Sequence, residues 1–287
     1  MIARAGAEPL VSADLLARVL AKLELATEPK LDLAGLNCLL AAFVGHVPND
    51  NIQKRIWLAG DRARPVTGGD PAEFFANWLD HGTGGTCFPA NGALCTVLRS
   101  IGFDARRISG SVVMEGIEQD GNHGSVLVRL DGIDYLVDAQ LAAFEALPLV
   151  PGQPASTGDG IHDIEAVPAA HGFDVHWYPG SNRQKPLIMR PDLEMGAVDH
   201  AYFLSQYARS ASSSRRRSPF NEALFIARHF RDCIVVVSRN ARTEVSADNR
   251  ATRREITLAE RARCLVEELG ISEPAVAAIP PDEAVDV

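Results

Sequence analysis

The dipeptide Asp131-Gly132 restricts the fold of this chain more than any other feature, because it separates two runs of alternating apolar and polar residues, 125–130 and 133–138. Asp-Gly favours the two-residue turn that joins a pair of antiparallel strands. Such a turn pairs Leu130 with Ile133 and thereby fixes the partner of every residue further along both strands. The sequence therefore predicts a β-hairpin of defined register.

The register of this hairpin brings an imidazole and a carboxylate together. If the pairing continues, His123 lies opposite Gln140, and Asp138 lies opposite Ser125. Side chains alternate between the two faces of a strand, so His123 and Asp138 share a face as diagonal neighbours, roughly 6 to 8 Å apart between backbone positions. We expect these two side chains to form a direct hydrogen bond.

The hydrophobic period changes along the chain, from helical before Gly102 to alternating after it. A third region after residue 201 is mixed. The expected helices are 12–25 behind a Ser12 or Asp14 cap, 33–44, 71–79, 87–101, one around Phe220 to Phe230, and a last helix from the capping box Thr257–Glu260 to Gly270. Further strands are expected at 108–113, 174–178 and 233–238. This order predicts an α+β protein with a helical segment 1–102, a β segment 103–200 and an α/β segment 201–287.

Composition and charge exclude several classes of protein. With 287 residues, 46% of them hydrophobic, the chain can bury a sizeable core. A net charge of -9 opposes a nucleic-acid surface. No window approaches the roughly 20 apolar residues of a membrane span, and the N-terminus does not resemble a signal peptide, so we expect a soluble, cytoplasmic protein with no membrane partner. The five cysteines include no Cys-x-x-Cys pair, which favours reduced thiols and no metal site.

One of these cysteines, Cys87, follows Gly84-Gly85-Thr86 at the predicted start of a helix. A helix N-terminus carries about half a positive charge, which stabilises a thiolate over a thiol. A His oriented by an acid can take the thiol proton, so Cys87, His123 and Asp138 form a candidate catalytic triad. The alternative for Cys87 is a small buried hydrophobe. This alternative is favoured for the other four cysteines, Cys38, Cys95, Cys233 and Cys264, because their surroundings are apolar.

These residues resemble the arylamine N-acetyltransferases, whose nucleophile lies in a Gly-Gly-x-Cys-Phe motif. The matching residues are Gly84–Phe88 with Asn91, then His123, then Tyr135–Asp138, with weaker matches at Val47–Ile52 and at Ser218-Pro-Phe. The resemblance implies an N-terminal helical bundle, a central β-barrel and a C-terminal α/β lid, built on a cysteine-protease or transglutaminase-like core. It also implies ping-pong transfer of an acyl group, in the family an acetyl group, from a coenzyme A thioester through Cys87 to a small-molecule amine, with Gly121 and Ser218 as coenzyme A contacts.

The chain departs from the family pattern beside the triad. Thr83 stands where the family usually has Arg, Pro89 where it has Glu, and Gln140, Leu141 and Ala142, after Ala139, replace its Gly-Phe-Gly. We expect Gln140 and Leu141 to lie beside the space that a donor or acceptor enters. The departures bear on arylamine and acetyl-CoA specificity more than on acyl transfer, and they predict weak acetylation of simple arylamines.

Three alternatives stay open at this point. An amide synthase of natural-product assembly would take its acyl chain from a carrier-protein thioester. A cysteine hydrolase of transglutaminase-like or papain-like chemistry would use the same triad with water as the acceptor. A binding protein could keep the fold without the chemistry.

Overall fold

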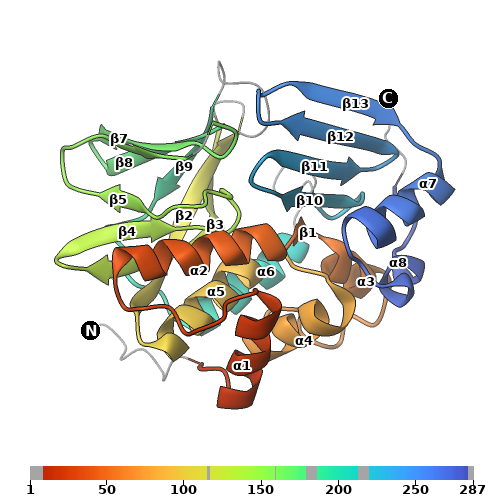
Figure 1. Ribbon diagram of the computed structural model, residues 1–287, viewed down its shortest axis with the longest axis horizontal. Coiled ribbons are helices and arrows are strands. Elements are labelled where there is room, and N and C mark those ends of the chain that lie inside the picture. The colour runs from red at the N-terminus through yellow and green to blue at the C-terminus, as the bar shows by residue number, and fades with distance from the viewer. Residues whose placement is uncertain (1–8, 115–116, 159, 179–185, 213–219, 284–287) are drawn as a thin grey trace.

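The computed structural model describes residues 9–114, 117–158, 160–178, 186–212 and 220–283. Its helices α1 to α5 form one group, beside which lie a large curved sheet and a smaller sheet covered by the last helices (Figure 1). This arrangement matches the expected helical bundle, barrel and α/β region. Within the described residues, no helix has both the length and the apolar character needed to cross a membrane.

The helices of the N-terminal bundle follow the predicted pattern. Ser12 caps the first helix by accepting a hydrogen bond from the backbone of Leu15, and Gly102 ends the last one in a left-handed conformation, with φ 112°. The second helix continues to His46, two residues beyond the expected end, because Gly45 remains helical and Pro48 lies outside it. The bounds are α1 (Ala13–Lys22), α2 (Leu33–His46), α3 (Ile52–Ala59), α4 (Pro71–His81) and α5 (Cys87–Ile101). The short helix α3 was not predicted.

Eight strands form the large sheet, in the order β5-β4-β3-β2-β9-β8-β7-β6. They are β2 (Asp104–Met114), β3 (Ile117–Leu130), β4 (Ile133–Val137), β5 (Leu147–Leu149), β6 (Ala155–Thr157), β7 (Ile164–Ala169), β8 (Gly172–Trp177) and β9 (Leu187–Pro191). The sheet curls until β5 approaches β6 and β7, which makes a nearly closed barrel around apolar side chains such as Ile108 and Phe173. Leu130 pairs with Ile133, and Asp131 and Gly132 both have positive φ, so the predicted hairpin is confirmed.

The smaller sheet contains strands from both ends of the chain, in the order β1-β10-β11-β12-β13. These strands are β1 (Asn49–Asp50), β10 (Phe225–His229), β11 (Cys233–Ser238), β12 (Ala241–Ser246) and β13 (Ala251–Glu255). The helix predicted around Phe220 to Phe230 is wrong, because this segment contains β10. Its apolar residues fit either period, and β1 and β11 on its two sides satisfy its backbone groups as a strand.

The C-terminal helices pack on the smaller sheet through an apolar cluster that includes Ile226, Val237 and Leu265. The capping box of Thr257 and Glu260 is present and starts α7 (Leu258–Arg263). The helix then widens into a π-helical turn, η1 (Cys264–Glu268), before Gly270, and the unpredicted α8 (Glu273–Ala278) follows.

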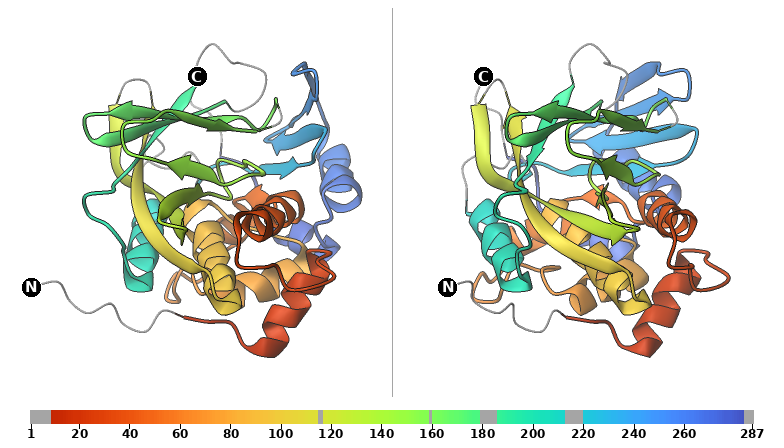
Figure 2. Two further views of the ribbon diagram at one scale, coloured as in Figure 1. Left: turned by 60° about the vertical axis from the view of Figure 1, so that its left-hand side comes forward. Right: turned by 90° about the vertical axis from the view of Figure 1, so that its left-hand side faces the viewer.

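Helix α5 lies at the centre of the molecule and positions the site. It contacts α4, the strands β2 and β3, and the unpredicted helix α6 (His200–Ala211). Figure 2 shows the long strands β2 and β3 curving past it. All but three residues of α5 are buried. Its first residue is therefore held beside β3 by packing along the whole length of the helix.

Candidate active site

Cys87 is the first residue of α5, as the sequence predicts, and it follows the N-cap residue Thr86. Thr86 makes no side-chain hydrogen bond to the first turn. The preceding loop passes so close to β1 that a Cβ on Gly84 would lie 1.9 Å from the carbonyl oxygen of Pro48, so only glycine fits there. The thiol therefore lies at the positive end of the helix dipole, on a tightly held loop.

His123 and Asp138 form the hydrogen bond that the hairpin register predicts. His123 Nε2 and Asp138 Oδ2 are 2.7 Å apart, and the two residues are 5% and 3% exposed. Strand β4 ends at Val137, so Asp138 is the first residue beyond the paired region, while His123 pairs with Gly110 of β2 on the other side. Val126 pairs with Val137, the residue before Asp138, and this register places the side chains of His123 and Asp138 on one face of the hairpin.

A buried asparagine, Asn91, holds the second oxygen of the carboxylate. Asn91 Nδ2 donates to Asp138 Oδ1 at 2.9 Å and to the carbonyl oxygen of Gly124 at 2.7 Å, and its Oδ1 accepts from Ala139 N at 2.8 Å. Sequence reasoning noted Asn91 only as part of a motif and gave it no role. The missed signal is its spacing, since a residue four positions after Cys87 lies on the same face of the helix.

The three side chains shift one another's ionisation. Burial alone would lower the pKa of His123, but Asp138 and Cys87 outweigh it and raise this pKa to about 10. Burial pushes the pKa of the Cys87 thiol upward, but the charge of His123 and a hydrogen bond with it keep the pKa below its ordinary value. Burial would raise the pKa of Asp138, but the charge of His123 and the hydrogen bond with it outweigh burial and lower this pKa. Both shifts favour the thiolate and imidazolium pair over the neutral thiol and imidazole.

The imidazole is also placed correctly for this pairing. Asp138 occupies Nε2 of His123, so the nitrogen left to face the thiol is Nδ1. The Cys87 sulfur additionally receives a hydrogen bond from the backbone N–H of Gly124, the residue after His123. These three side chains can act as a nucleophile, a base and an acid that orients the base, which is what nucleophilic acyl transfer requires.

The remaining cysteines differ from Cys87 in their ionisation or exposure. Burial raises the pKa of Cys95 to about 12 and also raises that of Cys264. Cys233 is half-buried, and its pKa is likewise raised by burial. Cys38 is exposed, so the expectation that it is a buried hydrophobe is wrong, because its side of α2 faces away from the core.

Of the two residues expected to contact coenzyme A, the structure describes Gly121. Gly121 lies in β3, two residues before His123, with φ 58°, and its N–H donates to Ser111 Oγ at 3.2 Å. An added Cβ would lie 3.2 Å from the hydroxyl oxygen of Tyr202, so this glycine permits α6 to approach the strand. Ser218 lies outside the described residues.

The residues that depart from the family pattern are buried supports of the site. Thr83 is fully buried, and its hydroxyl accepts from Gln53 Nε2. Pro89 occupies the third position of α5 without disturbing the helix. Gln140 donates through Nε2 to the carbonyl oxygen of Gly85 at 3.1 Å, and Leu141 is buried in the barrel core. The expectation that Leu141 lies beside an entrance is therefore wrong.

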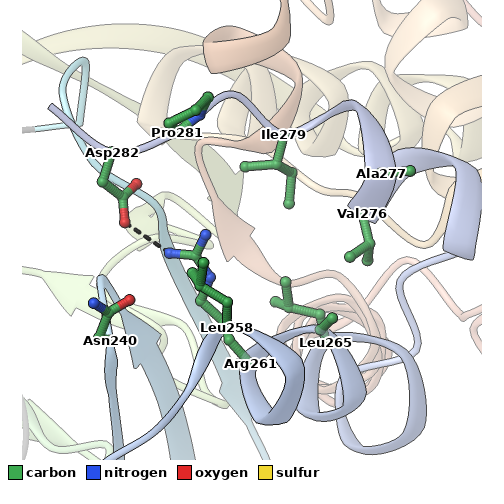
Figure 3. A pocket seen from close by; sticks show the side chains of 10 residues that line it. Asn240, Leu258, Arg261, Leu265, Val276, Ala277, Ile279, Pro281 and Asp282 are labelled. Carbon is green, nitrogen blue, oxygen red and sulfur yellow. Dashed lines mark hydrogen bonds and ion pairs between the residues drawn. The ribbon is translucent and has the colours of Figure 1, made fainter.

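A separate hollow of about 560 Å³ lies between α7, α8 and the C-terminal segment (Figure 3). Leu258, Leu265 and Val276 line it on the apolar side. Its charged wall is the ion pair of Arg261 and Asp282, whose nearest atoms are 2.7 Å apart. Because these charged groups are paired and none of the triad residues lines this hollow, it offers no comparable chemistry.

A Cys-His-Asp set of this geometry, on a helical bundle, a barrel and an α/β region, is typical of cysteine-dependent acyltransferases and hydrolases. The model of the N-acetyltransferase family matches residues 32–275. The chain therefore belongs to the arylamine N-acetyltransferase family.

Individual relatives share limited parts of the sequence. An arylamine N-acetyltransferase of Mycolicibacterium smegmatis is 30% identical over 125 residues, which are 42% of this chain and 43% of the relative. The uncharacterized acetyltransferase YvcN of Bacillus subtilis is 35% identical over 82 residues, 28% of this chain and 32% of the relative. The aligned parts thus span less than half of these relatives.

Solved structures match over most of their length. The arylamine N-acetyltransferase of Mycobacterium abscessus has a TM-score of 0.76 at 19% identity and covers 92% of this chain and 93% of its own. That of Salmonella typhimurium has a TM-score of 0.77 at 17% identity, with coverages of 94% and 98%. That of Bacillus cereus, described as having a Cys-His-Glu catalytic triad, has a TM-score of 0.74 at 16% identity, with coverages of 91% and 100%. These likenesses concern the fold.

Proposed function

We propose that this protein transfers an acyl group, acetyl in the simplest case, from a coenzyme A thioester to a small-molecule amine through a thioester on Cys87. The observation that carries the proposal is the buried hydrogen bond of 2.7 Å between His123 and Asp138, next to a thiol of lowered pKa. Membership of the arylamine N-acetyltransferase family supports the choice of acyl donor and of an amine as acceptor.

In the first half-reaction the Cys87 thiolate attacks the carbonyl carbon of the donor thioester. The bond between that carbon and the coenzyme A sulfur breaks, and His123 gives its proton to the departing thiolate. The developing negative charge on the carbonyl oxygen lies near the N-terminus of α5, where the helix dipole stabilises it. The products are acyl-Cys87, free coenzyme A and a neutral imidazole.

In the second half-reaction the neutral imidazole acts as a base. It takes a proton from the amine as the amine nitrogen attacks the thioester carbon, and Cys87 leaves as a thiolate. Asp138 stabilises the imidazolium that forms and keeps Nδ1 directed at the sulfur. The enzyme returns to the thiolate and imidazolium pair, so the two substrates react in turn in a ping-pong sequence.

Two residues, Gly121 and Ser218, are proposed to contact coenzyme A. We assign Gly121, two residues before His123 on β3, a place beside the donor from the family resemblance. Ser218 is assigned only from the family resemblance. The donor could also be the same thioester group carried on an acyl carrier protein, since both present a pantetheine arm to the thiol.

Intact mass spectrometry tests the proposal directly. Incubation with acetyl-CoA should add one acetyl group to the wild-type protein and none to Cys87→Ala, and later addition of an arylamine should remove it as the amide. Turnover that is unchanged without amine would identify a hydrolase. Acylation by a carrier-protein thioester but not by acetyl-CoA would identify an amide synthase, and a protein that no thioester acylates would disprove acyl transfer.

A further inference from the structure

The nucleophile loop Gly84–Gly85 is held from two sides by residues outside the triad. On one side the carboxylate of Asp50 accepts from Gly84 N at 2.5 Å, and Asp50 N donates to the carbonyl oxygen of Gly85 at 3.3 Å. On the other side Gln140 Nε2 donates to the same carbonyl oxygen at 3.1 Å. The carbonyl of Gly85 thus receives two donors, and both peptide groups of the loop are fixed just before Cys87.

The two holding residues are themselves anchored to different parts of the fold. Asp50 belongs to β1, pairs with Ile226 of the smaller sheet, and accepts at Oδ1 from the N–H of Ile52, the first residue of α3. Gln140 donates its backbone N–H to Asp138 Oδ1 at 2.8 Å. The loop is therefore connected to the smaller sheet on one side and to the acid of the triad on the other.

We propose that Asp50 and Gln140 are positioning residues that clamp the nucleophile loop, and that the clamp holds Cys87 against His123 only while the Asp50 carboxylate is ionised. The proposal rests on the proposed function for its catalytic meaning, but not for its geometry. Resemblance to the family does not supply Gln140, which replaces one of the glycines that the family usually has there.

The dependence on charge follows from the donors around Asp50. Both of its carboxylate oxygens accept a backbone N–H, and protonation turns one of them into a hydroxyl, which is a much weaker acceptor. Protonation therefore weakens the hydrogen bond to either Gly84 or Ile52. Burial, which outweighs these two hydrogen bonds, raises the pKa of Asp50 to about 7, so this change falls within the working range of most enzymes.

The other titratable groups near Asp50 and Cys87 are not expected to lower the reactivity of Cys87 between pH 8 and pH 6 in the same way. On α6, Tyr207 senses the charge of Asp50, but its pKa is raised, mainly by burial, so it stays neutral between pH 6 and pH 8. Lys54 of α3 donates to Ser210 Oγ, and burial lowers its pKa to about 8. It gains charge as the pH falls, which favours the Cys87 thiolate and so opposes a loss of reactivity at low pH. Both shifts in the pair of Cys87 and His123 favour its ionised form, and Asp50→Asn separates the titration of this pair from that of Asp50.

The rate at which iodoacetamide alkylates Cys87, followed by peptide mass spectrometry, tests the clamp without any substrate. In the wild type we expect the rate to fall about ten- to hundredfold from pH 8 to pH 6, as the clamp opens and the thiol loses the imidazolium. Asp50→Asn should be slow at both pH values, since an amide presents a donor to one of the two N–H groups. Gln140→Ala should lower the rate while keeping the pH dependence.

A matched control is Asp32→Asn, because Asp32 also accepts a backbone N–H, from Gly35 at 2.8 Å, but caps α2 away from the loop. This variant should behave as the wild type, and circular dichroism should show that every variant compared is folded. Equal alkylation rates in the wild type and in both clamp variants at pH 6 and pH 8 would overturn the clamp. If the rates behave as expected but acetyl-CoA acylates none of the proteins, the clamp stands and the proposed function fails.

Discussion

Replacing Asn91 with alanine should damage the site more than the fold. The substitution removes three buried hydrogen bonds and leaves two partners, the carbonyl oxygen of Gly124 and the N–H of Ala139, without Asn91 as donor or acceptor. Each buried group that loses its partner costs about 1 to 3 kcal/mol, so the free energy of unfolding should fall by about 2 to 6 kcal/mol. Since domains are stable by about 5 to 15 kcal/mol, a folded population should remain.

The effect on chemistry comes from Asp138, which loses one of the donors that hold Oδ1 in place. A hydrogen bond to a charged group is worth about 1.5 to 3 kcal/mol, so acylation of Cys87 by acetyl-CoA should slow about ten- to hundredfold. The apparent pKa of the Cys87 thiol, measured from the pH dependence of alkylation, should rise because His123 is oriented less well. Urea unfolding gives the stability, and rapid-quench mass spectrometry gives the acylation rate.

Asn51 offers a matched control for this prediction. It is equally buried and makes three side-chain hydrogen bonds, all of them to backbone groups, of Phe220, Ala223 and Phe225. Asn51→Ala should lose a similar amount of stability without moving the thiol pKa. If Asn91→Ala and Asn51→Ala lose the same stability and neither changes the thiol pKa or the acylation rate of the folded protein, Asn91 does not orient the triad.

Three further predictions follow from individual residues. Iodoacetamide at pH 7 should modify Cys87 well before Cys95, whose pKa is raised to about 12, and equal rates in peptide mapping would contradict the thiolate assignment. Burial lowers the pKa of His229 from 6.5 to about 3, so as the pH falls below 6.5 this histidine is protonated in the unfolded chain before it is protonated in the folded protein. The free energy of unfolding should therefore decline by up to about 1.4 kcal/mol per pH unit below 6.5. In urea unfolding, His229→Phe should show a smaller decline. Thr257→Ala should cost about 1 kcal/mol of stability through loss of the capping box, and an unchanged melting temperature would show that α7 does not depend on its cap.

Local sequence signals were sufficient where the structure is determined by neighbours in the chain. The Asp131-Gly132 turn fixes its hairpin because only a few conformations close two residues between twisted strands, and this register places His123 beside Asp138. The start of α5 follows from a helical period that begins after two glycines. The same reasoning failed between Phe220 and Phe230, because this short apolar segment fits both the helical and the strand period. It forms a strand because it pairs with β1 and β11.

The three residues Cys87, His123 and Asp138 could therefore be predicted from the sequence, but the residues that hold them in place could not. Sequence alone determined the hairpin, the helix start at Cys87 and the pairing of base and acid, because each depends on spacing within one element or one tight turn. Only the tertiary structure decided that Cys87 reaches His123, that Asn91 and Gln140 hold Asp138, and that Asp50 of β1 holds the nucleophile loop. These contacts join segments far apart in the chain, and their geometry is set by the packing of α5 between the barrel and the other helices, which no local pattern encodes.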